Sequence, residues 1–113
     1  MTIFELRRFS AVAFGHRYRL ELLSALGLAA AGQGICLSLL AGCCGVTASV
    51  YYPPVRRMTE SGMVVTSGPD RSERRVLYAR TAVPVWTGLR KMVEDLAVDV
   101  DLASAALSWP AAS

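Results

Sequence analysis

The sequence predicts one mostly helical α+β domain, in which a β-hairpin separates a group of N-terminal helices from a long C-terminal helix. Three observations support this fold class. The chain has 113 residues, which is the length of a single domain with one hydrophobic core. Apolar residues recur at helical spacing near both ends of the chain. Between these stretches, two short strand-like segments flank a Gly-Pro-Asp-Arg loop.

Two helices are expected first, over about residues 2–14 and 16–26. Phe4, Phe9 and Val12 are the apolar positions of the first helix, and leucines at helical spacing form one face of the second. A glycine-rich connector should follow the second helix.

A helix-turn-helix is expected over about residues 35–62. Ile35–Gly42 reads as a short apolar helix, and Gly45–Thr47 reads as a tight turn. In that turn, glycine adopts backbone angles that other residues avoid, and threonine is a good N-cap for the next helix. Gly62 is placed to end that helix.

Pro53 and Pro54 interrupt the second helix of this motif. In a helix interior each proline removes a backbone donor and clashes with the preceding turn, at a cost of about 3 kcal/mol or more. We therefore expect a turn over Thr47–Tyr51, followed by a helix that starts at one of the prolines and ends near Glu60.

A β-hairpin is predicted over about residues 63–80. Three arginines, Arg71, Arg74 and Arg75, fall near its tip. They would make the hairpin a basic projection.

A long helix is predicted over about residues 84–107, beginning near Pro84, which suits a first helical turn. Its apolar residues recur every three and four positions for longer than one small domain can bury, which predicts pairing with another chain. The complete order of elements is typical of a single winged helix-turn-helix domain spanning residues 1–113.

The positive charge of the chain is concentrated in residues 1–91. This segment contains all 12 Lys and Arg and five acidic residues, whereas residues 92–113 contain four acidic residues and no base. Eleven of the 12 bases are arginine, which makes forked contacts to phosphate and guanine. The pattern suits a polyanionic partner, although an arginine-rich solvated surface has the same composition.

Two segments resemble the bacterial arsenic-repressor (ArsR/SmtB) family of transcriptional regulators. They are similar to that family's opening helix pair and to its turn, recognition helix and exit into the wing. The residues that carry the resemblance are Arg19, Leu22 and Leu23 within residues 11–26, and Gly45–Thr47, Val55, Met58 and Gly62–Val64. The similarity covers residues 4–98, and the MarR family shares much of the pattern.

The resemblance implies a homodimer, joined through its first and last helices, that binds double-stranded DNA. Each recognition helix would enter a major groove, and each wing would lie beside the DNA backbone. The residues placed to face the groove are Thr47, Ser49, Tyr51 and Tyr52, and those placed to reach phosphates are Arg56, Arg57, Arg71, Arg74 and Arg75.

The sequence therefore predicts a sequence-specific, cytoplasmic transcriptional regulator, and more specifically a repressor that binds a pseudo-palindromic operator as a homodimer. Two alternatives remain open, the first because of the proline pair and the second because of the cysteines. One is a winged-helix module that binds a protein partner without reading DNA sequence. The other is a regulator that responds to thiol oxidation.

Neither a metal site, a cofactor nor catalysis is expected. Metal-sensing members of the resembled family use a Cys-x-Cys pair; Cys36 matches the first position, but Ser38 occupies the second. Cys43 and Cys44 lie two helical turns further on, about 10 Å along the axis. We expect buried cysteines in a reducing cytosol, with a thiol switch at Cys43 or Cys44 as the alternative. His16 is the only histidine, with no nucleophile in a known spacing and no phosphate-binding loop nearby.

The uncharged stretch between Glu21 and Arg56 has the hydropathy of a membrane span. Within its most apolar part, Leu22–Leu40, Gly27, Gly32, Gln33 and Gly34 interrupt the run, and both flanks of the stretch are basic, so no membrane segment is expected. The N-terminus lacks the pattern of a signal peptide.

Overall fold

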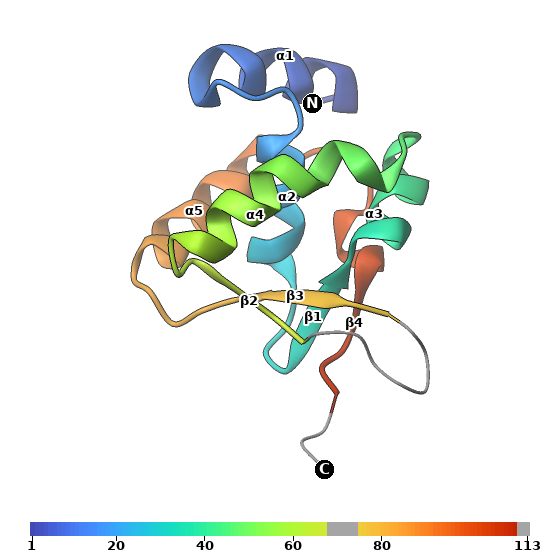
Figure 1. The fold of residues 1–113 in the computed structure, drawn as a ribbon. Helices are drawn as coiled ribbons and strands as arrows, with labels where there is room; N and C mark the ends of the chain where they lie inside the picture. The colour runs from blue at the N-terminus through green and yellow to red at the C-terminus, as the bar shows by residue number, and fades with distance from the viewer. Residues whose placement is uncertain (68–74, 111–113) are drawn as a thin grey trace.

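The computed structural model describes residues 1–67 and 75–110, and it places helices above a small antiparallel sheet (Figure 1). The elements in chain order are α1 (Ile3–Phe14), α2 (Arg19–Leu28), β1 (Gln33–Cys36), α3 (Leu37–Cys44), the 3-10 helix η1 (Ala48–Tyr51), α4 (Tyr52–Glu60), β2 (Val64–Thr66), β3 (Leu77–Arg80), α5 (Val85–Leu96), the 3-10 helix η2 (Leu102–Ala105) and β4 (Ala106–Ser108). This arrangement confirms the predicted fold class, a mostly helical α+β winged helix-turn-helix.

The centre of the molecule is α2, whose residues from Leu20 to Gly27 are all buried. It contacts α1, α4, α5 and η2 as well as strands β1 and β3. A helix that is covered on every side needs apolar residues all round, which explains the uncharged stretch of the sequence. Among the described residues, no helix is long and apolar enough to cross a membrane.

The sheet has the strand order β2-β3-β1-β4, and each pairing is antiparallel. Strands β2 and β3 form the base of the wing, with Val65 opposite Ala79. Strand β1 occupies residues that were predicted to form the end of a connector and the first turn of the Ile35–Gly42 helix. The predicted start of that helix is therefore wrong. Pairing with β3 and β4 holds Ile35 in a strand, fully buried, and α3 begins at Leu37.

The prediction of one long C-terminal helix is wrong. Helix α5 ends at Leu96, and Ala97 adopts a left-handed conformation with φ of 47°. The chain then turns back through η2 and β4, and Leu102 and Ala105 pack in the core of the same chain. The apolar spacing that was read as a dimer seam is therefore satisfied largely within the domain. β-Branched and aspartate residues just after Ala97 are poor helix formers, which favours the break.

The predicted break at the prolines is confirmed. The residues before the prolines form η1, and α4 begins at Tyr52 with both prolines in its first turn and ends at Glu60. Proline is well tolerated there because the first N–H groups of a helix have no partner inside the helix. The double proline therefore starts the helix.

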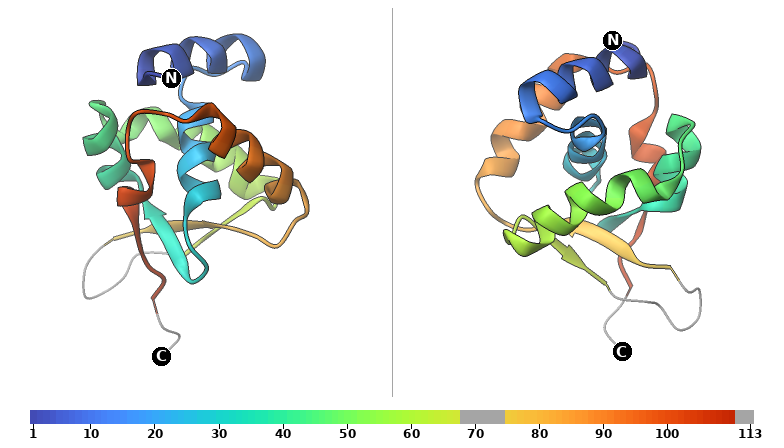
Figure 2. Two further views of the ribbon diagram at one scale, coloured as in Figure 1. Left: turned by 180° about the vertical axis from the view of Figure 1, so that it is seen from behind. Right: turned by 45° about the horizontal axis from the view of Figure 1, so that its top comes forward.

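Helix α1 lies at one end of the molecule and packs mainly on α2 (Figure 2). Thr2 and Glu5 form a capping box at its start, and Gly15 ends it with a φ of 71°. Three large apolar side chains, Phe4, Phe9 and Val12, are 67%, 44% and 89% exposed on its outward side, next to the exposed Glu5 and Arg8. The Phe4 ring lies below the Arg7 guanidinium and the Phe9 ring meets that of Phe14 edge-on, and both partners belong to α1 itself.

Candidate nucleic-acid interface

The turn between α3 and α4 is built as the sequence predicted. Gly45 ends α3 in the left-handed conformation, with a φ of 70°. The N–H of Val46 then donates to the carbonyl of Ala41 at 3.1 Å, and the Val46 side chain packs against the core. Thr47 occupies the N-cap position of η1, although its side chain makes no capping hydrogen bond to the backbone.

The exposed surface of η1 and α4 carries most of the side chains that were predicted to contact DNA. Thr47 and Ser49 are exposed, with their hydroxyl oxygens 2.9 Å apart. Tyr52 is 48% exposed, and Arg56 and Arg57 are exposed on the next turn of α4. These five side chains are accessible to a large ligand.

Tyr51 was predicted to face the groove, and this prediction is wrong because its side chain is fully buried. Its hydroxyl donates to Oε2 of Glu21 at 2.6 Å, and its ring meets that of Tyr18 edge-on. The short 3-10 turn of η1 directs Tyr51 inward and leaves Tyr52 outside.

Tyr51 belongs to a buried ionic network that joins the helix-turn-helix to the N-terminal helices. The Arg7 guanidinium donates to both carboxylate oxygens of Glu21, at 2.8 and 3.3 Å, and to the carbonyl of Cys44 at 2.8 Å. Arg7 is 5% exposed and Glu21 is fully buried. The network therefore links the end of α3 and the 3-10 helix η1 to α1 and α2 by hydrogen bonds.

Glu21 and burial together shift the pKa values in this network. The hydrogen bond and the negative charge of Glu21 raise the pKa of Arg7 and keep it charged. Burial and the hydrogen bond to Glu21 raise the pKa of Tyr51, so its hydroxyl remains a donor. Burial also raises the pKa of the Cys44 thiol to about 12.

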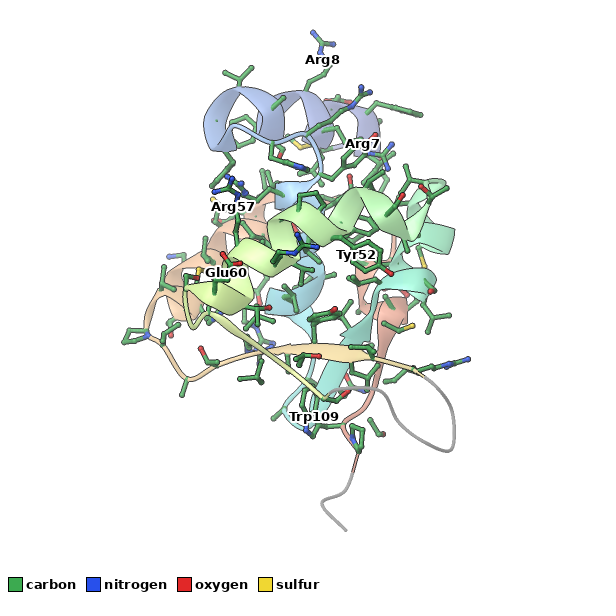
Figure 3. All side chains as sticks on the ribbon, viewed as in Figure 1. Arg7, Arg8, Tyr52, Arg57, Glu60 and Trp109 are labelled. Atoms are coloured by element: carbon green, nitrogen blue, oxygen red, sulfur yellow. The ribbon has the colours of Figure 1, made fainter. Side chains whose placement is uncertain are left out.

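The base of the wing faces the start of α4. Arg75 is exposed at the beginning of the returning strand, whereas Arg71 and Arg74 lie outside the described residues. A cavity of about 220 Å³ separates Tyr52 from the wing strand and is lined by Cys36, Leu37, Ser38, Tyr52, Arg75, Val76 and Tyr78. Figure 3 shows Tyr52 on the side of α4 that faces the sheet.

Two residues of this cleft, Ser38 and Tyr78, were not predicted as site residues. Ser38 is exposed in the first turn of α3, where helix N–H groups favour anions. Tyr78 lines the same cleft as Tyr52, and burial, with a smaller contribution from Tyr52, raises its pKa. The strand register places Tyr78 beside α3, opposite Ile35, and that register had no signal in the sequence.

Arg57 faces a different side of α4 from Tyr52 and lies toward the C-terminal end of α1 (Figure 3). Burial lowers the pKa of His16, and the positive charges of Arg19 and Arg57 lower it further. The Nη1 of Arg19 donates to the carbonyl of Phe14 at 2.5 Å.

The cysteines do not come together as a metal site. Cys36 and Cys44 are buried and Cys43 is exposed, and the Cys43 sulfur lies 2.9 Å from the Ser104 hydroxyl. No group of three or more potential metal ligands occurs within residues 1–67 and 75–110.

No protein-family model matches the chain, and no curated protein matches it in sequence. Among solved structures, the chain is similar to a crystal structure described as the predicted DNA-binding transcriptional regulator from E. coli. The two share 20% sequence identity and a TM-score of 0.50, over 81% of this chain and 90% of that chain. At this level of identity, the likeness is one of fold.

Proposed function

We propose that the protein is a sequence-specific DNA-binding transcriptional regulator, with no catalytic activity or cofactor. The observation that carries the proposal is the accessible row of Thr47, Ser49, Tyr52 and Arg56 on the recognition element, beside Arg75 of the wing. Hydroxyl and phenol groups can read base edges, whereas arginines hold phosphates. The fold shared with the E. coli regulator supports the same role.

The finer proposal is a cytoplasmic repressor of the ArsR/SmtB type that binds a pseudo-palindromic site as a homodimer. The basic charge of residues 1–91 supports a polyanionic partner. With the long C-terminal helix absent, support for the dimer rests on the exposed apolar face of α1. Two copies joined there would bury side chains that are otherwise in water.

The first test is selection of bound duplexes from random-sequence DNA at two salt concentrations, followed by sequencing. A DNA-binding regulator should enrich a two-fold symmetric site and lose affinity steeply as salt rises. Salt-sensitive binding without enrichment would contradict sequence-specific reading. Absence of binding at both salt concentrations would favour the protein-interaction module instead.

Single substitutions test whether the exposed residues of α4 and the wing make the DNA contacts. Arg56→Gln and Arg75→Gln should each weaken binding to every sequence by roughly tenfold, because each removes a charge-assisted phosphate contact. Tyr52→Ala should change the preferred sequence instead. Arg90→Gln is the matched control, because Arg90 is exposed on α5 and pairs with Glu94 at 3.3 Å.

A further inference from the structure

A second cavity lies between α1, α2, α4 and α5, on the side of α4 away from the wing cleft. Its volume is about 450 Å³, within the range of small-molecule sites. The residues that line it are Phe14, Arg19, Leu23, Pro54, Arg57, Met58, Ser61, Met63 and Leu89. Most of this lining is apolar, and Leu23, Pro54 and Met58 are buried.

The charged groups at this cavity are all positive. Arg19 and Arg57 contribute guanidinium groups, and the described lining contains no acidic side chain. Arg19 is held beside the cavity by its hydrogen bond to Phe14, whereas Arg57 takes part in neither of the ion pairs found among the described residues. A guanidinium that has no carboxylate partner and borders an apolar hollow is suited to an anion carried on an apolar body.

We propose that this cavity binds a small aromatic carboxylate, with its ring among Phe14, Met58 and Met63 and its carboxylate on Arg57 and Arg19. Methionine sulfur and aromatic edges make favourable contacts with a ring. The two guanidinium groups supply forked donors for the carboxylate oxygens. A neutral ring would fill the same volume but would offer the two arginines no negative charge.

An occupant would touch the proposed recognition helix, because Pro54, Arg57 and Met58 belong to α4 and Ser61 is its C-cap. This link to regulation rests on the proposed function, whereas binding to the cavity does not. The experiment below therefore uses the protein without DNA, and its result is independent of the DNA selection.

The test is titration calorimetry of the full chain with 1-naphthoate, and with the uncharged 1-naphthalenemethanol as the matched ligand. Naphthoate should bind with one site per chain, and the alcohol should bind more weakly. Arg57→Gln should raise the Kd for naphthoate by roughly tenfold or more and leave the weak binding of the alcohol unchanged.

Arg56→Gln is the control variant, because it removes an exposed arginine from the same helix without touching the cavity. It should bind naphthoate like the original protein. Thermal unfolding of both variants checks that the fold is intact, which their exposed positions favour. The proposal is overturned if naphthoate does not bind, if the alcohol binds equally well, or if both arginine variants lose affinity to the same extent.

Discussion

Glu21 carries a negative charge into the centre of the molecule, and two neighbouring side chains compensate for it. Arg7 provides two hydrogen bonds and the opposite charge, and Tyr51 provides a third hydrogen bond. A buried pair of this kind adds little net stability compared with an apolar pair, but loss of one partner leaves the other charge without compensation. We infer that its main effect here is to fix the position of the turn before α4.

Replacement of Glu21 by glutamine should lower the free energy of unfolding by about 3–5 kcal/mol, because Arg7 would remain buried and charged. Tyr51→Phe should lower it by only about 1.5–3 kcal/mol, the contribution of one hydrogen bond to a charged group. Urea unfolding followed by circular dichroism measures both changes.

The double variant Arg7→Met, Glu21→Leu tests the cause of that loss. It removes both charges, so it should be more stable than Glu21→Gln alone. Equal instability of the two proteins would show that packing, rather than the uncompensated charge, explains the loss.

The cysteines offer a second prediction at this scale. Because burial raises the pKa of Cys44 to about 12, this group is a neutral thiol at pH 8, and the thiolate is the reactive form. Iodoacetamide at pH 8 should therefore modify the exposed Cys43 well before Cys44 and the buried Cys36. Peptide mass spectrometry over time gives the order. Equal rates at Cys43 and Cys44 would contradict the burial of Cys44 and restore it as a candidate thiol switch.

The site residues show where residue-scale reasoning from sequence stops. Five residues of η1, its N-cap and the first half of α4 were predicted to contact DNA. Four of them are exposed and remain candidates, namely Thr47, Ser49, Tyr52 and Arg56, whereas Tyr51 is buried. Tyr51 and Tyr52 are neighbouring residues of the same type, so the sequence does not distinguish them. Which of the two is buried depends on the 3-10 turn and on Glu21, which lies 30 residues from Tyr51 along the chain. Spacing along the chain contains no information on such a distant partner.

At the scale of elements, the C-terminal strand β4 is held in place by close packing between the backbone of Gly34 and the ring of Trp109. Gly34 is buried in β1, opposite Leu107 of β4. A Cβ atom at Gly34 would lie 2.8 Å from the nearest ring carbon of Trp109 and 3.0 Å from Leu77. The backbone N–H of Trp109 also donates to the carbonyl of Gly32 at 2.8 Å.

Gly34→Ala should therefore destabilise the sheet and displace Trp109, because the added methyl group meets the ring at less than contact distance. The expected result is a lower melting temperature with a red-shifted tryptophan emission. Gly42→Ala is the control, since nothing lies within 4 Å of a Cβ there and Gly42 lies in α3. That change should stabilise the protein by about 0.5–1 kcal/mol. Unchanged emission and stability in Gly34→Ala would mean that Trp109 does not pack on β1.

Helix boundaries were predicted correctly where the residues at the boundary determine them. Proline at the start of α4 and glycine at the turn act through the backbone of a few neighbouring residues, and both predictions were confirmed. Strands β1 and β4 depend on pairing between residues about 70 positions apart. Their apolar residues are equally compatible with helical spacing, which is why Ile35 was assigned to a short helix and Leu107 to the end of a long one.

At the scale of the whole molecule, the proposed DNA surface and the apolar face of α1 belong to different elements. The wing and α4 present arginines and hydroxyl groups, whereas α1 presents Phe4, Phe9 and Val12. A dimer through α1 would leave both recognition elements accessible. The apolar composition of 53% is high for a chain of this length, which favours such a contact.

The dimer is tested by replacing Val12 with glutamate, because Val12 is 89% exposed at the centre of that face. Sedimentation equilibrium should give twice the 12.2 kDa chain mass for the original protein and the chain mass for the variant, since a buried unpaired charge opposes association. Val85→Glu is the matched control: Val85 is 50% exposed at the start of α5, where a carboxylate is favourable. Dissociation by Val85→Glu but not by Val12→Glu would move the interface to α5. A monomeric original protein would exclude the homodimer and require that each chain bind DNA alone.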